Sequence, residues 1–258
     1  MAQLTFLGTG TSTGIPEIGC TCPTCTSDDP RDNRLRVSAL IQEGEESLLI
    51  DCGPDFREQL LRAKVDRLNA ILVTHEHYDH VGGLDDIRPL FRKQSACHVY
   101  AEPNVIHAIK TRMPYAFMEN KYPGVPDIEL IPTFPFEPLR ITDHITVEPL
   151  RVIHGKLPIL GFKIGNLAYI TDCKTLPDET IEKVRGVDTL IINTLRTYPH
   201  ISHLSLEESL KYIRQIQPKR TYLIHFAHTF GRHIEIEKLL PQDVFAAYDG
   251  LTISFDIK

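Results

Sequence analysis

The 258-residue chain is 42% hydrophobic and 24% charged, and its formal net charge is −6. This length can bury one large hydrophobic core, so we expect one domain over residues 1–258. The negative charge and the lack of a long Lys/Arg run argue against a protein whose main task is gripping a polynucleotide backbone, but they are compatible with a small phosphorylated substrate.

No segment has the pattern of a signal peptide, and no apolar run approaches the length of a membrane span. Three of the six cysteines are scattered singly and three lie close together, which is not the pattern of a disulfide framework. We therefore expect a cytoplasmic protein that makes no contact with a membrane.

Residues 3–7 alternate as in a β-strand and lead into a loop with three glycines, Gly8, Gly10 and Gly14. Glycines of this kind either let backbone amides approach an anion or simply form a turn, and the sequence does not decide between the two. The loop is not a phosphate-binding P-loop, because the Lys-Ser/Thr ending is missing.

Cys20, Cys22 and Cys25 follow on a Pro-containing loop. A disulfide between cysteines two or three positions apart is geometrically poor. Three convergent sulfurs instead resemble most of a tetrahedral structural zinc site, with a fourth ligand supplied from elsewhere.

Residues 37–41 and 47–51 are predicted strands, and the second ends at Asp51. Pro54 suits the first turn of a helix whose apolar face is formed by Phe56, Leu60 and Leu61. Asp51 is either the N-cap of this helix or a residue that acts near the site described next.

The apolar run 69–73 is a predicted buried strand, and it is followed by three histidines and an aspartate within six residues. Imidazoles and carboxylates are the ligands of zinc, manganese and iron. His75 and His77 can hold one ion, and Asp79 and His80 can face a second. The spacing of Leu84, Ile87, Leu90 and Phe91 then predicts a helix.

A strand at 97–101 and a helix at 103–112 are predicted next. The segment 113–140 contains six prolines, which exclude a long helix or a central strand. This Pro-rich excursion is a lid over the pocket, an oligomer contact or a plain surface loop.

The remaining chain alternates strands and helices, and three strand ends carry candidate ligands, His154, Asp172 and His225. Sites in layered α/β proteins are built at strand ends. The predicted strands are 145–153, 161–165, 167–171, 189–193, 221–225 and 251–256, and the predicted helices are 178–185, 205–217 and 232–240.

The stretch from Thr74 to Leu84 resembles the His-x-His-x-Asp-His signature of metallo-β-lactamase-fold hydrolases. The resemblance implies an α/β fold of the αββα four-layer sandwich type. It also implies two divalent metal ions, zinc or manganese, in a dinuclear site. One ion would be held by His75, His77 and His154, the second by Asp79, His80 and His225, and Asp172 would bridge them.

The cysteine loop resembles a branch of this family that includes the phosphoribosyl 1,2-cyclic phosphate phosphodiesterase of phosphonate breakdown. In that branch the second histidine of a His-x-x-His completes the zinc site. The match here consists of Cys20, Cys22, Cys25 and His228. The loop around Ser202 and His203 also resembles the place of that enzyme's acid histidine.

His203 is therefore the predicted general acid, with His200 as its rival, and Asp79 is the second predicted catalytic residue. The alternative for His203 is a histidine that merely precedes the start of a helix near Ser205. The resemblance also allows a homodimer, since dimers are common among relatives.

The predicted function is a dinuclear-metal phosphodiesterase acting on a small or cyclic phosphodiester such as phosphoribosyl 1,2-cyclic phosphate. The alternatives are a tRNA 3′-end processing nuclease, a thioester or lactam hydrolase, and a non-catalytic ligand-binding member of the fold. A tRNA nuclease would need a basic arm, and the Pro-rich excursion is not rich in Lys or Arg.

Overall fold

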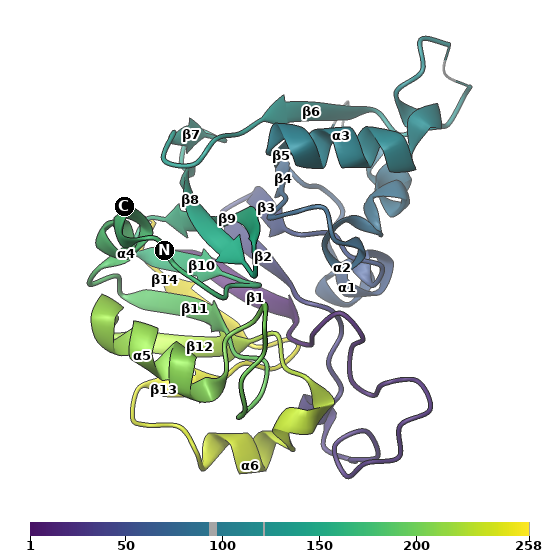
Figure 1. Ribbon diagram of the computed structural model, residues 1–258. Helices are drawn as coiled ribbons and strands as arrows, with labels where there is room; N and C mark the ends of the chain where they lie inside the picture. Colours follow the sequence, from purple (N-terminus) through teal and green to yellow (C-terminus); the bar gives the residue numbers. More distant parts are fainter. Residues whose placement is uncertain (93–96, 121, 258) are drawn as a thin grey trace.

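The computed structural model describes residues 1–92, 97–120 and 122–257, and two seven-stranded sheets run through it (Figure 1). The first sheet has the order β14-β1-β2-β3-β4-β5-β6 and the second the order β13-β12-β11-β10-β9-β8-β7. In the first sheet the strands are β1 Ala2–Gly8, β2 Ser38–Glu43, β3 Glu46–Ile50, β4 Ala70–Leu72, β5 Cys97–Ala101, β6 Ile128–Pro132 and β14 Thr252–Phe255. In the second they are β7 Leu139–Arg140, β8 Thr146–His154, β9 Leu157–Ile164, β10 Leu167–Ile170, β11 Thr189–Asn193, β12 Arg220–Ile224 and β13 Val244–Ala246.

The two sheets repeat one pairing pattern. Taken from β14 to β6 and from β7 to β13, each sheet has antiparallel pairs followed by parallel pairs, and the change occurs at β3 and at β10. The two sheets are thus similar in outline.

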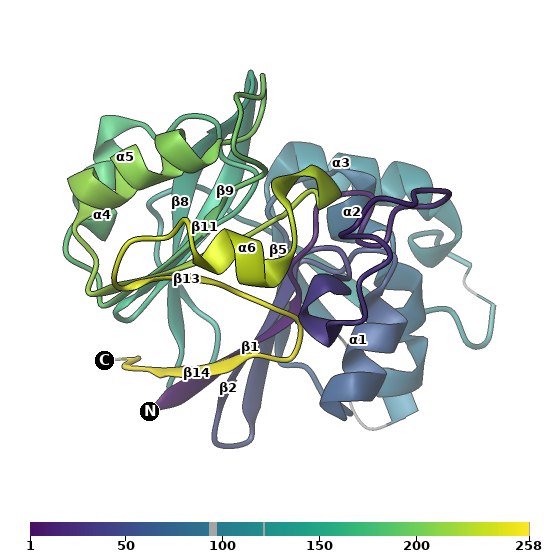
Figure 2. The same ribbon diagram turned by 90° about the horizontal axis from the view of Figure 1, so that it is seen from below.

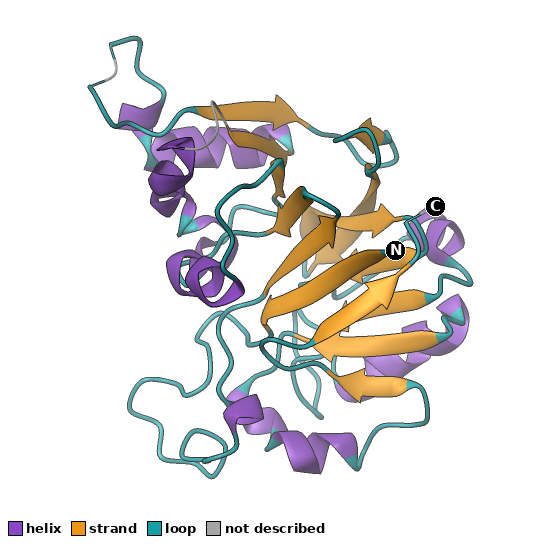
Figure 3. Ribbon diagram, turned by 180° about the vertical axis from the view of Figure 1, so that it is seen from behind, coloured by secondary structure: helices purple, strands orange, loops and turns teal. Residues whose placement is uncertain are grey.

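Helices cover the outer face of each sheet (Figures 2 and 3). On the first sheet these are α1 Phe56–Ala63, α2 Tyr78–Val81, the 3₁₀ segment η2 Leu84–Arg92 and α3 Pro103–Arg112, and on the second α4 Asp178–Val184, α5 Leu206–Ile216 and α6 His233–Glu237. Three apolar cores separate the layers: one between the sheets, and one under each set of helices. The predicted αββα sandwich is therefore confirmed.

Several local predictions differ from the structure. Leu61 is 59% exposed, and Gln59 takes its place on the inner face because it donates a 2.8 Å hydrogen bond to the Arg36 carbonyl. The helix begins at Phe56 after the N-cap Asp55, so Pro54 lies just outside it.

The segment predicted as helical after Gly83 is a 3₁₀ helix with Pro89 inside it. Leu84, Ile87 and Leu90 are buried as expected, and the side chain of Phe91 lies outside the described residues. There are two further 3₁₀ turns near these features. The turn η1 Pro30–Asp32 follows the cysteine loop in the sequence, and η4 His228–Phe230 follows His225.

The Pro-rich excursion contains the short turn η3 Pro114–Ala116 and two strands that the sequence did not predict, β6 and β7. Both are the last strand of their sheet, a position that tolerates proline because one side needs no ladder hydrogen bonds. Strand β13 was also missed. Among the described residues, no helix is long and apolar enough to cross a membrane.

Candidate metal centre

Strands β3, β4, β8, β10 and β12 all end at one edge of the sandwich, where they deliver acidic and imidazole side chains. His154 is the last residue of β8, while Asp51, Asp172 and His225 come one or two residues after their strands. Three of these residues have positive φ angles: 60° for Asp51, 53° for Asp172 and 64° for His225. Such left-handed conformations cost energy and are concentrated at functional sites.

The seven predicted ligands form two overlapping groups. His75, His77, His154 and Asp172 place one ligand atom each within 4.8 Å of one another, and so do Asp79, His80, Asp172 and His225. Asp172 belongs to both groups. The structure therefore brings together all seven residues in the arrangement that the sequence predicts.

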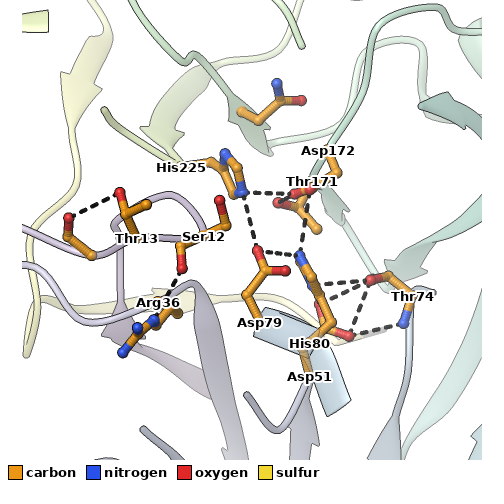
Figure 4. A network of polar contacts seen from close by, with 12 residues as sticks. Ser12, Thr13, Arg36, Asp51, Thr74, Asp79, His80, Thr171, Asp172 and His225 are labelled. Atoms are coloured by element: carbon orange, nitrogen blue, oxygen red, sulfur yellow. Dashed lines mark hydrogen bonds and ion pairs between the residues drawn. The ribbon is translucent and has the colours of Figure 1, made fainter. Parts of the chain in front are cut away.

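The Nε2 atoms of His225 and His80 converge on the Asp172 carboxylate without forming hydrogen bonds. His225 Nε2 lies 3.1 Å from Asp172 Oδ1, and His80 Nε2 lies 3.4 Å from Asp172 Oδ2 (Figure 4). In the described part of the chain, the Nε2 atoms of His75, His80 and His225 are buried and have no hydrogen-bond partner. A buried polar atom without a partner is costly, so these nitrogens need a ligand.

The donor set fits divalent metal ions. Ions that bind nitrogen and oxygen ligands at about 2.0–2.2 Å bring those ligand atoms to roughly 3–4 Å from one another, which matches the separations above. Neither group includes sulfur, so manganese and iron suit the site as well as zinc does.

The charges of the site point the same way. Burial opposes ionisation of Asp172, but the neighbouring His225 and His80 outweigh it and hold the pKa of Asp172 well below its usual range. Burial also lowers the pKa of His75, which keeps that imidazole neutral. His80 is also buried, but Asp172, Asp51 and Asp79 together raise its pKa. The carboxylate of Asp172 is thus held in its charged form next to positive charge.

Asp51 acts behind His80. Its carboxylate is fully buried and lies 2.6 Å from His80 Nδ1, and it accepts a 2.8 Å hydrogen bond from the Thr74 backbone N–H. The N-cap of α1 is Asp55, so the alternative role for Asp51 is wrong. Asp51 fixes the His80 tautomer that presents Nε2 to the carboxylates.

Two residues that the sequence did not single out have similar roles. The Ser202 carbonyl lies 2.8 Å from His154 Nδ1, and the Thr74 hydroxyl lies 3.0 Å from His75 Nδ1. Each directs the other ring nitrogen toward the centre. The position of Thr74 directly before His75 was a local signal for this contact, whereas the carbonyl of Ser202 carries no signal in the sequence.

His203 lies against the centre. Its ring centroid is 4.6 Å from that of His154 and 4.7 Å from that of His225, on which it stacks. The ring of His200 lies 5.2 Å from that of His203, farther from the centre. Burial lowers the pKa of His203 to about 3, so its imidazole is neutral at pH 7 and carries one N–H donor.

The predicted structural zinc residues also meet. Cys20, Cys22, Cys25 and His228 form a third group, in which His228 Nδ1 is 3.3 Å from Cys20 Sγ and 3.4 Å from Cys22 Sγ. Glu17 Oε2 lies 2.8 Å from His228 Nε2 and orients the ring. Hydrogen bonds from the Cys25 backbone and from His228 lower the pKa of Cys22 to about 6, which favours the thiolate that binds metal. All six cysteines are free.

The glycines of the N-terminal loop serve chain packing. A Cβ atom on Gly8 would lie 2.0 Å from the Arg36 carbonyl oxygen, and one on Gly10 would lie 2.9 Å from that of Arg34. Gly14 has a φ of 67°. These glycines thus let the loop lie against residues 34–36.

A family model described as "Beta-lactamase superfamily domain" matches residues 46–226, which include all seven residues of the two groups. The chain belongs to this superfamily. A crystal structure titled as a new diphosphatase from the PhnP family superimposes on the chain with a TM-score of 0.93 and 37% identity, covering 99% of this chain and 98% of that one. This chain is therefore a PhnP-like member of the superfamily.

Two further relatives mark how far the similarity reaches. A curated Octanoyltransferase of Porphyromonas gingivalis is 46% identical over 255 residues, which cover 98% of this chain and 51% of that protein. The chain thus spans about half the length of this relative. Zn²⁺-bound PqqB of Methylobacterium extorquens has a TM-score of 0.79 at 20% identity, covering 98% of this chain and 100% of that one, which shows a shared fold.

Asp51→Asn should weaken metal binding by the PhnP-like centre. Asparagine has one acceptor oxygen in place of two, so it cannot accept hydrogen bonds from both the Thr74 backbone N–H and His80 Nδ1, and the imidazole loses the negative partner that fixes its tautomer. We expect about 10- to 100-fold weaker binding, measured by competition with a chelator. The exposed Asp143→Asn serves as the control, and unchanged metal affinity in Asp51→Asn would contradict the role of Asp51.

Cys22→Ser should remove one zinc ion per chain and lower the Tm, because the cysteine group then loses a thiolate. Each 1 kcal/mol lost shifts the Tm of a chain this size by about 2–4 °C. Elemental analysis and calorimetry measure both quantities, with Thr21→Ser in the same loop as control. Full zinc content in Cys22→Ser would refute a structural site at this position.

Proposed function

We propose that this protein hydrolyses a phosphodiester bond in a small phosphorylated metabolite, of which phosphoribosyl 1,2-cyclic phosphate is one example. The observation that carries the proposal is the pair of ligand groups that share Asp172, with His203 stacked beside them. Two adjacent metal sites next to a hydrogen-bond donor suit a displacement in which the attacking and the leaving oxygen both develop charge.

The metal ligands in this proposal are His75, His77 and His154 for one ion and Asp79, His80 and His225 for the other, with Asp172 between them. Two divalent ions, zinc or manganese, would lower the pKa of water and offset the charge on the attacking and leaving oxygens. A further zinc ion on the cysteine group would stabilise the N-terminal loop.

The chain itself orients the reacting groups. Asp51 and the Ser202 carbonyl hold the rings of His80 and His154 with their outer nitrogens toward the centre. In this proposal His203 acts as the general acid. The negative charge of the bound phosphodiester raises the pKa of its imidazole from the low value of the free site, and the resulting imidazolium gives its proton to the leaving alkoxide. Stacking on His225 fixes the plane of the ring. Leu195 N–H donates a 2.9 Å hydrogen bond to the Leu204 carbonyl, which fastens the loop that carries His203.

The similarity to a PhnP-family diphosphatase supports a small substrate with a disubstituted phosphorus. A phosphodiester and a substituted diphosphate resemble each other at the attacked phosphorus and differ in the leaving group, which is an alkoxide in one and a phosphate in the other.

Free cysteines are in keeping with the proposed location in a reducing cytoplasm. Neither a membrane nor a nucleic acid is a proposed partner, and a homodimer is the proposed assembly.

The test is turnover by the manganese- or zinc-loaded protein. The substrates are ribose 1,2-cyclic phosphates, 2′,3′-cyclic nucleotides, substituted diphosphates and bis(p-nitrophenyl) phosphate, with chelator-treated protein as control. Metal-dependent hydrolysis of the diesters is expected. Two bound ions with no turnover of any phosphate substrate would refute the proposal.

His203→Ala should separate substrates by their leaving group. Loss of a general acid costs about 10²- to 10⁴-fold when an alkoxide leaves. A nitrophenolate is a far weaker base and needs no proton, so kcat for bis(p-nitrophenyl) phosphate should change much less. His200→Ala is the matched control. An equal loss on both substrates would mean that His203 only shapes the site.

Hydrolysis of an acyl ester or thioester is the second candidate. It is favoured by the 46% identity to a relative named Octanoyltransferase, of which the matched part is about half. Octanoyl thioesters in the same assay distinguish the two candidates, because only the acyl hydrolase would release a thiol.

A further inference from the structure

The tip of the N-terminal loop, Ser12 and Thr13, lies at the edge of the metal centre. Thr11 N–H donates a 2.9 Å hydrogen bond to the carbonyl of Phe226, and Phe226 N–H donates a 3.0 Å bond to the carbonyl of Thr9. Because Phe226 directly follows His225, these two bonds fix the loop beside a predicted ligand. Figure 4 shows Ser12 next to His225 and Asp79.

Backbone hydrogen bonds hold the loop on both sides of this tip. Gly10 N–H donates to the Leu35 carbonyl at 2.8 Å, and Ile15 N–H donates to the Arg34 carbonyl at 2.9 Å. Both sides of the loop are therefore bonded to the neighbouring chain. Ser12 and Thr13 are nevertheless exposed, although Thr9, Thr11, Gly14 and Ile15 around them are buried.

One contact sets the direction of the tip. The Arg36 side chain donates a 3.1 Å hydrogen bond from Nε to the Ser12 carbonyl, and Asp55 Oδ1 holds Arg36 Nη1 at 2.9 Å. In a trans peptide the C=O and the next N–H point in opposite directions. The Thr13 N–H therefore points away from Arg36.

The donors of the tip are free. In the described part of the chain, the Ser12 hydroxyl and the backbone N–H groups of Ser12 and Thr13 have no hydrogen-bond partner. The Thr13 hydroxyl makes one long contact of 3.5 Å, to the Gly14 carbonyl. Arg36, the cation at this loop, is already neutralised by Asp55, so the tip offers neutral donors only.

We propose that Ser12 and Thr13 form a neutral hydrogen-bond donor pair that binds a phosphate oxygen of the substrate on the His225 side of the metal centre. This inference rests on the proposed phosphodiesterase function. A diester phosphate carries one negative charge, so uncharged donors suit it, whereas a dianionic monoester would call for a cation. The pair therefore favours phosphodiesters and substituted diphosphates over phosphomonoesters.

The test is Ser12→Ala, with Ser12→Thr to restore the hydroxyl and the exposed Thr111→Ala on α3 as control. For Ser12→Ala we expect kcat/KM for diesters to fall by about 10- to 100-fold, the range for one hydrogen bond to a charged group. Ser12→Thr should recover most of this loss. Metal content and Tm should stay at the wild-type values in all three variants.

Calorimetric titration of the metal-loaded proteins with dimethyl phosphate supplies a readout that needs no turnover. Ser12→Ala should weaken its binding by a similar factor, and Thr111→Ala should not. If the wild type hydrolyses no diester but Ser12→Ala still weakens dimethyl phosphate binding, the donor pair stands and the proposed function fails. Wild-type binding and turnover in Ser12→Ala would overturn the donor pair itself.

Discussion

The burial of three carboxylates beside imidazoles is the constraint on which the rest of the site depends. Asp51, Asp79 and Asp172 are at most 8% exposed and converge on His80. Asp51 and Asp172 come from the ends of β3 and β10, and Asp79 lies in α2 directly before His80. Isolated charges of this kind are strongly destabilising unless each is hydrogen-bonded or offset by opposite charge. Strand ends meet this requirement, since two sheets can bring residues far apart in sequence to one edge without exposing the backbone.

Close backbone packing behind the ligand loop makes this convergence feasible. A Cβ atom on Gly53 would lie 1.9 Å from the Asp79 carbonyl oxygen, and one on Gly83 would lie 2.1 Å from that of Gly53. The resulting contact allows Cys52 N–H to donate a 2.7 Å hydrogen bond to the His80 carbonyl. Gly53 and Gly83 thus support the histidine motif, because any larger side chain would push the loop outward.

Local patterns predicted most strands and helices and the ligand-rich loop, whereas the αββα sandwich itself was implied by the family resemblance. The histidine motif follows a buried strand, and both features lie within one short window of sequence. Long-range contacts were not readable in the same way. Asp51 could be assigned to His80 only once the structure placed them 2.6 Å apart, and Leu61 lies outside because Gln59 gained a distant partner, the Arg36 carbonyl. Strands β6, β7 and β13 are short edge elements whose pairing partners, more than their own residues, define them.

Each ligand group draws on both halves of the pseudo-symmetric sandwich. His75, His77, Asp79 and His80 come from the first sheet, whereas His154, Asp172 and His225 come from the second. An ion in either group would therefore act as a cross-link between the two sheets, closing a long loop of chain that the hydrophobic core alone must otherwise close. The metal centre lies on the boundary between the two halves. The side chains that hold the two sheets together are therefore the same ones on which the proposed catalysis depends.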